Sequence, residues 1–135
     1  GGSYENRIKL PTDIVRRVRQ AVGKDFIIIY RLSMLDLVEG GSTWPEVTEL
    51  AHRIKAAGAS IINTGIGWHE AKVPTIATMV PRGAYAWVTR KMMAENIGIP
   101  LCTTNRINTP ETAEHIIADG YELYIMMMIT TTILH

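Results

Sequence analysis

The stretch ASIINTGIGWHEAKVPT, residues 59–75, joins an apolar run to a loop of polar and aromatic residues. Residues 59–62 are small or apolar, which is typical of a short buried strand. Two glycines, a tryptophan, a histidine, a glutamate and a lysine follow where that strand ends. Loops that a rigid sheet holds in place often carry catalytic and binding residues. The stretch therefore predicts a strand whose carboxyl end carries a candidate functional site.

A pattern of helix followed by strand repeats on both sides of this stretch. Ser3 is a suitable N-cap for a first helix, and three further helices are expected from residues 44, 84 and 110. Glycines at 23, 58 and 120 end three of these four helices. The predicted strands cover residues 26–31, 60–64, 99–103 and 122–127. The first of them is apolar on both faces, which indicates burial in a parallel sheet.

Alternating helices and strands require right-handed crossovers and a parallel sheet. Two architectures accept this order: half of a (β/α)8 barrel, or an open doubly wound sheet. In both, functional residues gather at the carboxyl ends of the strands. Arg31 ends the first predicted strand, and His69 and the segment Thr104–Arg106 follow the second and third, so they are candidate site residues. No strand is followed by a GxGxxG or GxxxxGKS/T motif, which argues against Rossmann-type or P-loop nucleotide binding.

Composition narrows the function classes further. The 135 residues are enough for one modest domain, and a net charge of +1 gives no reason to expect nucleic acid or a membrane surface as partner. A single cysteine, Cys102, excludes an internal disulfide framework and a Cys-rich metal site. No apolar run is long enough to span a bilayer, and the N-terminus lacks a signal peptide. We expect a cytoplasmic protein without a metal site, and a chain that is part of something longer.

Several segments carry a family resemblance. Residues 1–7, GGSYENR, resemble the GGSxxNR motif of the old yellow enzyme family of flavin reductases. Residues 25–39, 61–70 and 103–108 resemble one branch of that family, the bacterial NADPH-dependent 2,4-dienoyl-CoA reductases. The similarity extends over about residues 1–120. It implies an α/β fold, the FMN-binding (β/α)8 TIM barrel, of which this chain is the second half with four parallel strands, from the fourth helix to the eighth strand.

The resemblance implies an FMN site. Arg31 matches an arginine on the pyrimidine side of the flavin, where a cation stabilises the negative charge of the reduced ring. Thr104, Asn105 and Arg106 match the segment near the ribityl chain and phosphate, and the planar guanidinium suits phosphate. From the residues alone, a structural ion pair for Arg31 and a solvent-exposed loop position for Arg106 stay open.

The resemblance also implies a substrate site. His69 matches an active-site histidine that works beside a tyrosine from an earlier strand, which is not in this chain. Histidine suits proton transfer because its pKa lies near neutrality, although a loop histidine bonded to backbone is the plainer alternative. The stretch that lines the substrate thioester corresponds to Glu70, Ala71, Lys72 and Val73.

The expected activity is reduction of a conjugated double bond in an enoyl- or dienoyl-CoA thioester, by hydride from reduced FMN with NADPH as the electron source. The FAD, 4Fe-4S cluster and NADPH sites of the family member would lie outside this chain. Near the eighth strand, Ile129 stands where the family has a phosphate-binding arginine. The alternative is a half-barrel without catalysis, stable only by self-association or by pairing with another chain, because an open sheet exposes its edges.

Overall fold

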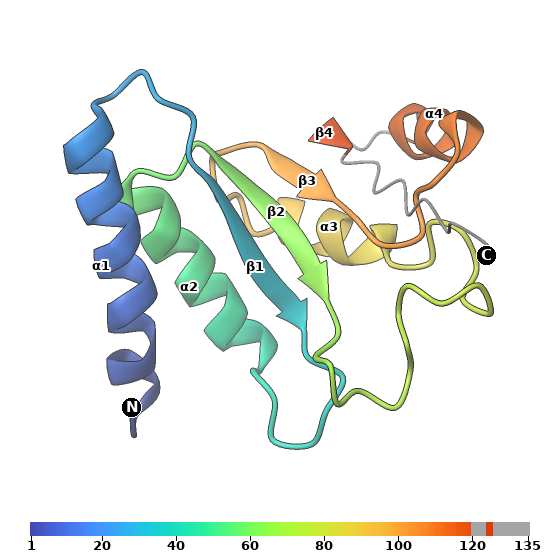
Figure 1. Cartoon of the computed structure of the whole chain (residues 1–135), viewed down its shortest axis with the longest axis horizontal. Coiled ribbons are helices and arrows are strands. Elements are labelled where there is room, and N and C mark those ends of the chain that lie inside the picture. The colour runs from blue at the N-terminus through green and yellow to red at the C-terminus, as the bar shows by residue number, and fades with distance from the viewer. Residues whose placement is uncertain (120–123, 126–135) are drawn as a thin grey trace, which may run out of the picture.

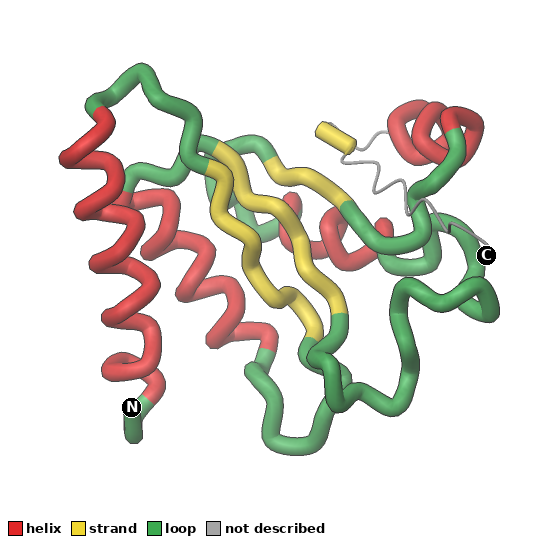
Figure 2. Tube along the Cα trace, in the orientation of Figure 1, coloured by secondary structure: helices red, strands yellow, loops and turns green. Residues whose placement is uncertain are grey.

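Helices and strands alternate throughout residues 1–119 and 124–125, which are the residues that this computed structural model describes (Figures 1 and 2). The order along the chain is α1 (Tyr4–Val22), β1 (Ile29–Leu35), α2 (Trp44–Ala57), β2 (Ile61–Ile66), α3 (Ala86–Met93), β3 (Leu101–Thr103), α4 (Pro110–Ala118) and β4 (Tyr124–Ile125). The predicted alternation is confirmed.

The described strands form a parallel sheet in the spatial order β1-β2-β3-β4. Each strand therefore lies beside its successor in sequence, as right-handed crossover connections produce. Ile29 pairs with Ile61 and Arg31 pairs with Asn63, but the register shifts after Ser33. Such a β-bulge re-aims the residues at the end of a strand, and this one lies at the carboxyl end of β1.

One face of the sheet packs against helices and forms the core. Leu32 and Ile62 point to this face, where Ile54 of α2 and Val88 and Met92 of α3 are completely buried. In Figure 1, α1 and α2 run side by side along one flank of the strands. Burial of this apolar layer is the main stabilising term for the sheet.

The helix ends follow the capping signals in the sequence. The Ser3 side chain accepts a hydrogen bond from the Asn6 N–H at the start of α1. The Thr43 N–H donates to Glu46 Oε2 at 2.8 Å at the start of α2. Gly58 ends α2 with φ 108°, in the left-handed region that glycine adopts without strain.

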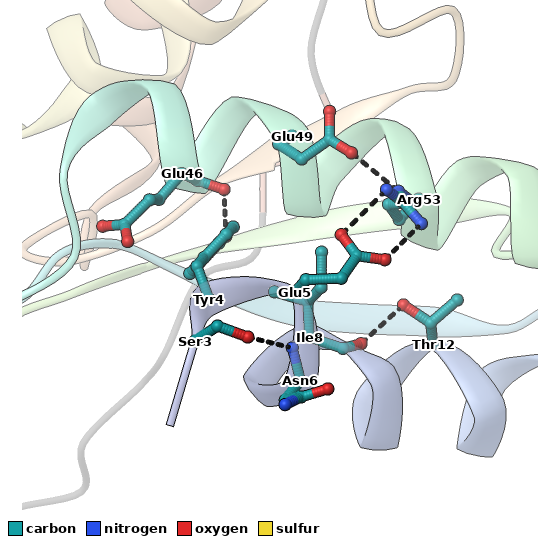
Figure 3. A network of polar contacts seen from close by, with 9 residues as sticks. All are labelled: Ser3, Tyr4, Glu5, Asn6, Ile8, Thr12, Glu46, Glu49 and Arg53. Carbon is teal, nitrogen blue, oxygen red and sulfur yellow. Dashed lines mark hydrogen bonds and ion pairs between the residues drawn. The ribbon is translucent and has the colours of Figure 1, made fainter. Parts of the chain in front are cut away.

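A network of polar contacts joins α1 to α2 (Figure 3). The Tyr4 hydroxyl donates to the backbone oxygen of Glu46, and burial together with the Glu46 carboxylate raises the pKa of Tyr4 to about 12. Tyr4 is therefore a neutral donor at neutral pH. Arg53 forms ion pairs with Glu5 at 3.2 Å and with Glu49 at 2.6 Å. These exposed pairs orient the two helices, but such pairs stabilise a fold only slightly.

The first strand begins and ends later than predicted. It covers Ile29–Leu35 rather than 26–31, so Arg31 lies inside the strand and not at its carboxyl end. Residues 26–28 are not part of β1, because their polar groups are bonded elsewhere. Arg19 Nη1 donates to the Phe26 oxygen at 2.7 Å, and the Ile28 N–H donates to Ser60 Oγ at 3.1 Å. These hydrogen bonds to side chains fix the segment between α1 and β1, so that β1 begins only at Ile29.

The expectation that this strand is buried on both faces is also wrong. Ile29 is 54% exposed and Phe26 is 58% exposed. The physical reason is that β1 lies at the edge of the sheet and, within the described residues, one of its faces is uncovered. The predicted pattern of apolar residues was correct, but none of the described residues covers that face of β1.

Three other elements differ in their bounds. The second strand covers Ile61–Ile66 rather than 60–64. The third strand begins at Leu101 rather than residue 99, and Pro100, which precedes it, has no N–H to donate. The third helix covers Ala86–Met93 rather than 84–96. Of the predicted fourth strand only Tyr124–Ile125 is described, and Gly120 and Ile129 lie outside the described residues. No described helix is both long enough and apolar enough to cross a membrane.

The core can be tested at Ile54, which has no exposed surface. Ile54→Ala should lower the free energy of unfolding by about 2–5 kcal/mol, because it removes buried methyl groups and leaves a cavity. Ile14→Ala on the exposed side of α1 is the matched control and should change it by less than about 0.5 kcal/mol. Urea unfolding of the chain measures both, and equal effects would contradict the assigned core.

Candidate active site at the carboxyl edge of the sheet

Backbone hydrogen bonds bring the loops after β1 and β2 together. The Gly67 N–H donates to the Leu35 oxygen at 2.6 Å, and the Trp68 N–H donates to the Asp36 oxygen at 2.8 Å. These bonds continue the pairing of the two strands past their ends. The loop that carries His69 therefore starts beside the loop that follows β1, as the sequence predicted for a parallel sheet.

Asp36 closes the glycine-rich loop after β1. Its carboxylate accepts hydrogen bonds from Ser33 Oγ and from the Ser42 N–H, each at 2.7 Å. Partial burial by itself raises the pKa of this carboxyl, but the hydrogen bonds from Ser42 and Ser33 outweigh burial and bring the pKa below its ordinary value. The group is thus a carboxylate at neutral pH and fixes the loop over residues 36–42.

Arg31 lies on the uncovered face of the sheet, beside a glycine. It is exposed and pairs in register with Asn63, which is buried. A Cβ at residue 65 would lie 3.2 Å from the Leu32 oxygen and 3.3 Å from Arg31 Nε. Gly65 therefore makes room for the arginine side chain. A cation next to bare backbone is a surface that accepts a planar group with oxygen acceptors on one side, so these residues fit the pyrimidine side of a flavin ring.

The polar side chains after β3 contact the loop after β2. The Thr104 hydroxyl contacts the Thr64 backbone oxygen and lies 2.8 Å from Asn105 Oδ1. Asn105 Nδ2 donates to Thr75 Oγ1 at 2.9 Å, and Thr75 Oγ1 donates to the Ile66 oxygen at 3.0 Å. Thr104 and Asn105 are buried. Both were predicted near the cofactor, and the structure adds that their side chains bond to protein.

Arg106 is half-buried and connects to the same loop. Its Nε donates to the Val80 oxygen at 2.9 Å, and its backbone oxygen accepts the Gly83 N–H at 3.0 Å. Its Nη atoms have no hydrogen-bond partner among the described residues. These Nη atoms remain available for an anion. The alternative, a loop arginine surrounded by solvent, does not account for the hydrogen bond from Nε to the Val80 oxygen.

His69 and its neighbours are exposed at the beginning of the long loop. The side chains of His69 and Glu70 are each 74% exposed, and His69 Nε2 lies 3.8 Å from Glu70 Oε1. The His69 ring centroid is 4.8 Å from that of Trp68. Lys72 and Val73 are exposed, and Ala71 is half-buried. Within the described residues, no contact joins His69 to Arg31 or Arg106.

Sequence reasoning did not identify Gly65, Asp36 or Thr75 as parts of the site. Gly65 lies two residues after Asn63 and so on the same face of the strand, a spacing that could have been noticed. Thr75 carries no local signal, because its partners are Asn105, in the loop after another strand, and Ile66, nine residues earlier in the chain. The described residues contain no group of three or more His, Cys, Asp or Glu side chains suited to a metal ion.

A parallel sheet with an arginine and a glycine on its open face, and with two long loops at its carboxyl edge, defines an α/β domain of the kind that binds ligands at that edge. The model of the NADH:flavin oxidoreductase / NADH oxidase family matches residues 1–129. The chain belongs to this family of flavin-dependent oxidoreductases.

Three relatives illustrate the range of the similarity. The chain is 37% identical over 127 residues to a metal reductase of Desulforamulus reducens, covering 94% of this chain and 19% of the relative. It is 38% identical over 124 residues to an NADH oxidase of Thermoanaerobacter brockii, covering 89% and 18%. A 2-naphthoyl-CoA reductase solved with 2-naphthoyl-CoA superposes with a TM-score of 0.86 at 32% identity, covering 94% of this chain and 20% of that one. The chain thus spans about a fifth of the length of these proteins.

The role of Asp36 predicts how stability depends on pH. A carboxyl whose pKa is lower in the folded state stabilises the fold above its unfolded pKa of about 3.9 and loses that effect as pH falls through the folded value. Asp36→Asn should therefore be less stable than the parent at pH 6, and the difference should shrink at pH 3. Urea unfolding at both pH values measures this. Glu39→Gln, an exposed change in the same loop, is the control. If the difference in stability between Asp36→Asn and the parent were the same at both pH values, the assignment would be contradicted.

Proposed function

We propose that this chain is the second half of an FMN-binding (β/α)8 barrel. With the rest of that barrel it would reduce the conjugated double bond of an enoyl- or 2,4-dienoyl-CoA thioester, with NADPH as the electron source. Membership of the flavin oxidoreductase family, the parallel sheet and the similarity to a CoA-thioester reductase support this proposal. The FAD, 4Fe-4S and NADPH sites would belong to other parts of the longer protein.

The exposed Arg31 beside Gly65 is the observation that carries the proposal. When bound, FMN supplies the hydride for the double bond. Arg31 would hold the electron-rich side of the ring, because a guanidinium favours the negative charge that reduction brings. Arg106 would hold the phosphate, since its Nη atoms have no partner among the described residues and its Nε contact keeps the guanidinium oriented.

His69 would deliver a proton to the substrate carbon. It is exposed at the carboxyl edge and carries no hydrogen bond to backbone within the described residues, which is contrary to the plainer alternative of a loop histidine held by backbone. Glu70, Ala71, Lys72 and Val73 follow on the same loop and would line the thioester. Their exposure leaves the charged and the apolar side chains free to contact a substrate.

The partner would be the missing half of the barrel. Among the described strands, β1 pairs only with β2, so its outer edge is open. A groove of about 350 Å³ runs along that edge, lined by residues of α1, β1 and α2. The outer side of α1 exposes Leu10, Ile14, Val18 and Val22 at intervals of four residues. A strand followed by a helix, the repeating unit of the barrel, would cover both surfaces.

The alternative is a half-barrel without catalysis that covers these surfaces with a second copy or another chain. Absorbance of the purified longer polypeptide separates the two functions, because bound flavin gives a yellow solution. A colourless protein that stays oligomeric would favour the alternative and contradict the proposed flavoenzyme.

Arg31→Ala tests the flavin assignment in the complete enzyme. Loss of the cation should weaken FMN retention or make the reduction potential of the bound flavin more negative, because the reduced ring carries more negative charge. Flavin content after gel filtration and a dye-coupled potential measure the two effects. Arg17→Ala, an exposed change on α1, is the control. Unchanged flavin content and potential in Arg31→Ala would refute the role.

His69→Ala tests the proton donor. It should slow substrate reduction on the order of 10²-fold, which is the usual contribution of one general acid. Flavin reduction by NADPH should be almost unaffected, because that step needs no proton at the substrate carbon. Mixing prereduced enzyme with a dienoyl-CoA isolates the step, and His52→Ala on the exposed side of α2 is the matched control. Equal rates for His69→Ala and the parent would make His69 an ordinary loop residue.

A further inference from the structure

The segment after β3 holds the loop between β2 and α3 at two separate points. That loop, residues 67–83, carries the whole predicted substrate stretch. Asn105 Nδ2 donates to Thr75 Oγ1 at 2.9 Å and lies 3.4 Å from the Ile66 oxygen. Arg106 binds the far end of the loop through the Val80 oxygen and the Gly83 N–H. Contacts from the segment after β3 therefore reach the loop from the end of β2 to Gly83.

The backbone of this segment is held in an unusual conformation. Asn105 has φ 69° and Arg106 has φ 62°, so both are in the left-handed region. Asparagine tolerates this region, but arginine adopts it rarely. Such residues persist where the surrounding contacts over-determine them, and they cluster at functional sites. Here the left-handed turn directs the Asn105 amide and the Arg106 guanidinium to the same loop.

Thr75 is the point on the loop where these contacts converge. It is 7% exposed although its neighbours Pro74 and Ile76 are exposed. Its hydroxyl donates to the Ile66 oxygen and accepts from Asn105, so both of its hydrogen-bonding roles are used. A Cβ at Gly67 would lie 2.8 Å from Thr75 Cγ2, so the loop folds back closely on its own beginning.

We propose that Asn105 and Thr75 are positioning residues that fix the 67–83 loop against the end of β2. They would present residues 68–73 at the carboxyl edge in one arrangement, without touching the reacting atoms. This assigns Asn105 a task different from the cofactor contact that the family resemblance implies. The effect on turnover rests on the proposed function, whereas the effect on the loop does not.

The rate of trypsin cleavage after Lys72 measures how firmly the 67–83 loop is held, because Lys72 is an exposed residue of that loop. Asn105→Asp keeps the size and the tolerance of a left-handed backbone but removes the donor to Thr75. Thr75→Val keeps the shape but removes the hydroxyl. In the full chain both variants should be cleaved at Lys72 about tenfold faster than the parent, the order expected when one buried hydrogen bond is lost.

Two matched variants and one internal site control for unfolding. Asn96→Asp changes another asparagine of positive φ, at an exposed position, and should leave the Lys72 rate unchanged. Thr75→Ser retains the hydroxyl and should restore most of the parent rate. Cleavage after Lys24, in the turn before β1, should be equal in all variants, because it reports opening elsewhere. Equal Lys72 rates in Asn105→Asp, Thr75→Val and the parent would overturn the proposal.

Turnover of the complete enzyme tests the consequence for catalysis. Thr75→Val should slow the reaction of prereduced enzyme with the dienoyl-CoA substrate about tenfold, with Thr75→Ser restoring it and with flavin content unchanged. Faster cleavage at Lys72 with unchanged turnover would overturn the link to catalysis. A loss of flavin in Asn105→Asp without faster cleavage would favour the cofactor contact instead. If the parent reduces no thioester, the proposed function fails, and the Lys72 rates alone decide whether the loop is fixed in this way.

Discussion

The parallel pairing of β1 with β2 is the constraint on which the rest of the structure depends. Its register puts Arg31 opposite Asn63 and Ser33 opposite Gly65, and the shift after Ser33 lets the Leu35 and Asp36 oxygens accept the Gly67 and Trp68 N–H groups. A slip of one residue would turn every side chain of a strand to the other face. The core, the arginine on the open face and the start of the 67–83 loop therefore all follow from one register.

The two faces of the sheet differ physically. The face toward the helices is closed by residues such as Ala51 and Ile54, with no exposed surface, while Ile29 on the opposite face of β1 is 54% exposed. An apolar edge strand without cover is unfavourable in water and prone to pairing. The same exposure leaves Arg31 accessible. Within the described residues, the open edge of β1 and the candidate cofactor surface are thus two consequences of the same uncovered face.

Around the site, the buried side chains that form hydrogen bonds are separate from the exposed side chains that could contact a ligand. Thr64, Thr75, Thr104 and Asn105 are buried and bond to backbone or to one another, as most buried polar groups do. His69, Glu70 and Lys72 are exposed and have few contacts. The loop is bonded at Gly67, Thr75 and Val80, and His69, Glu70 and Lys72 lie exposed between Gly67 and Thr75. This arrangement suits a site that must meet a ligand without losing its shape.

The order of helices and strands, the helix caps and the placement of His69 and Arg106 after strands could be predicted from the sequence, because local capping and periodicity determine them. The start of β1 could not, since the Arg19 and Ser60 side chains that delay it come from neighbouring helices and loops. Nor could the bonding of Asn105 to Thr75, thirty positions apart in the chain, or the place that Gly65 leaves for Arg31. Such contacts exist only after strands far apart in sequence have paired, so they were decided by the tertiary structure alone.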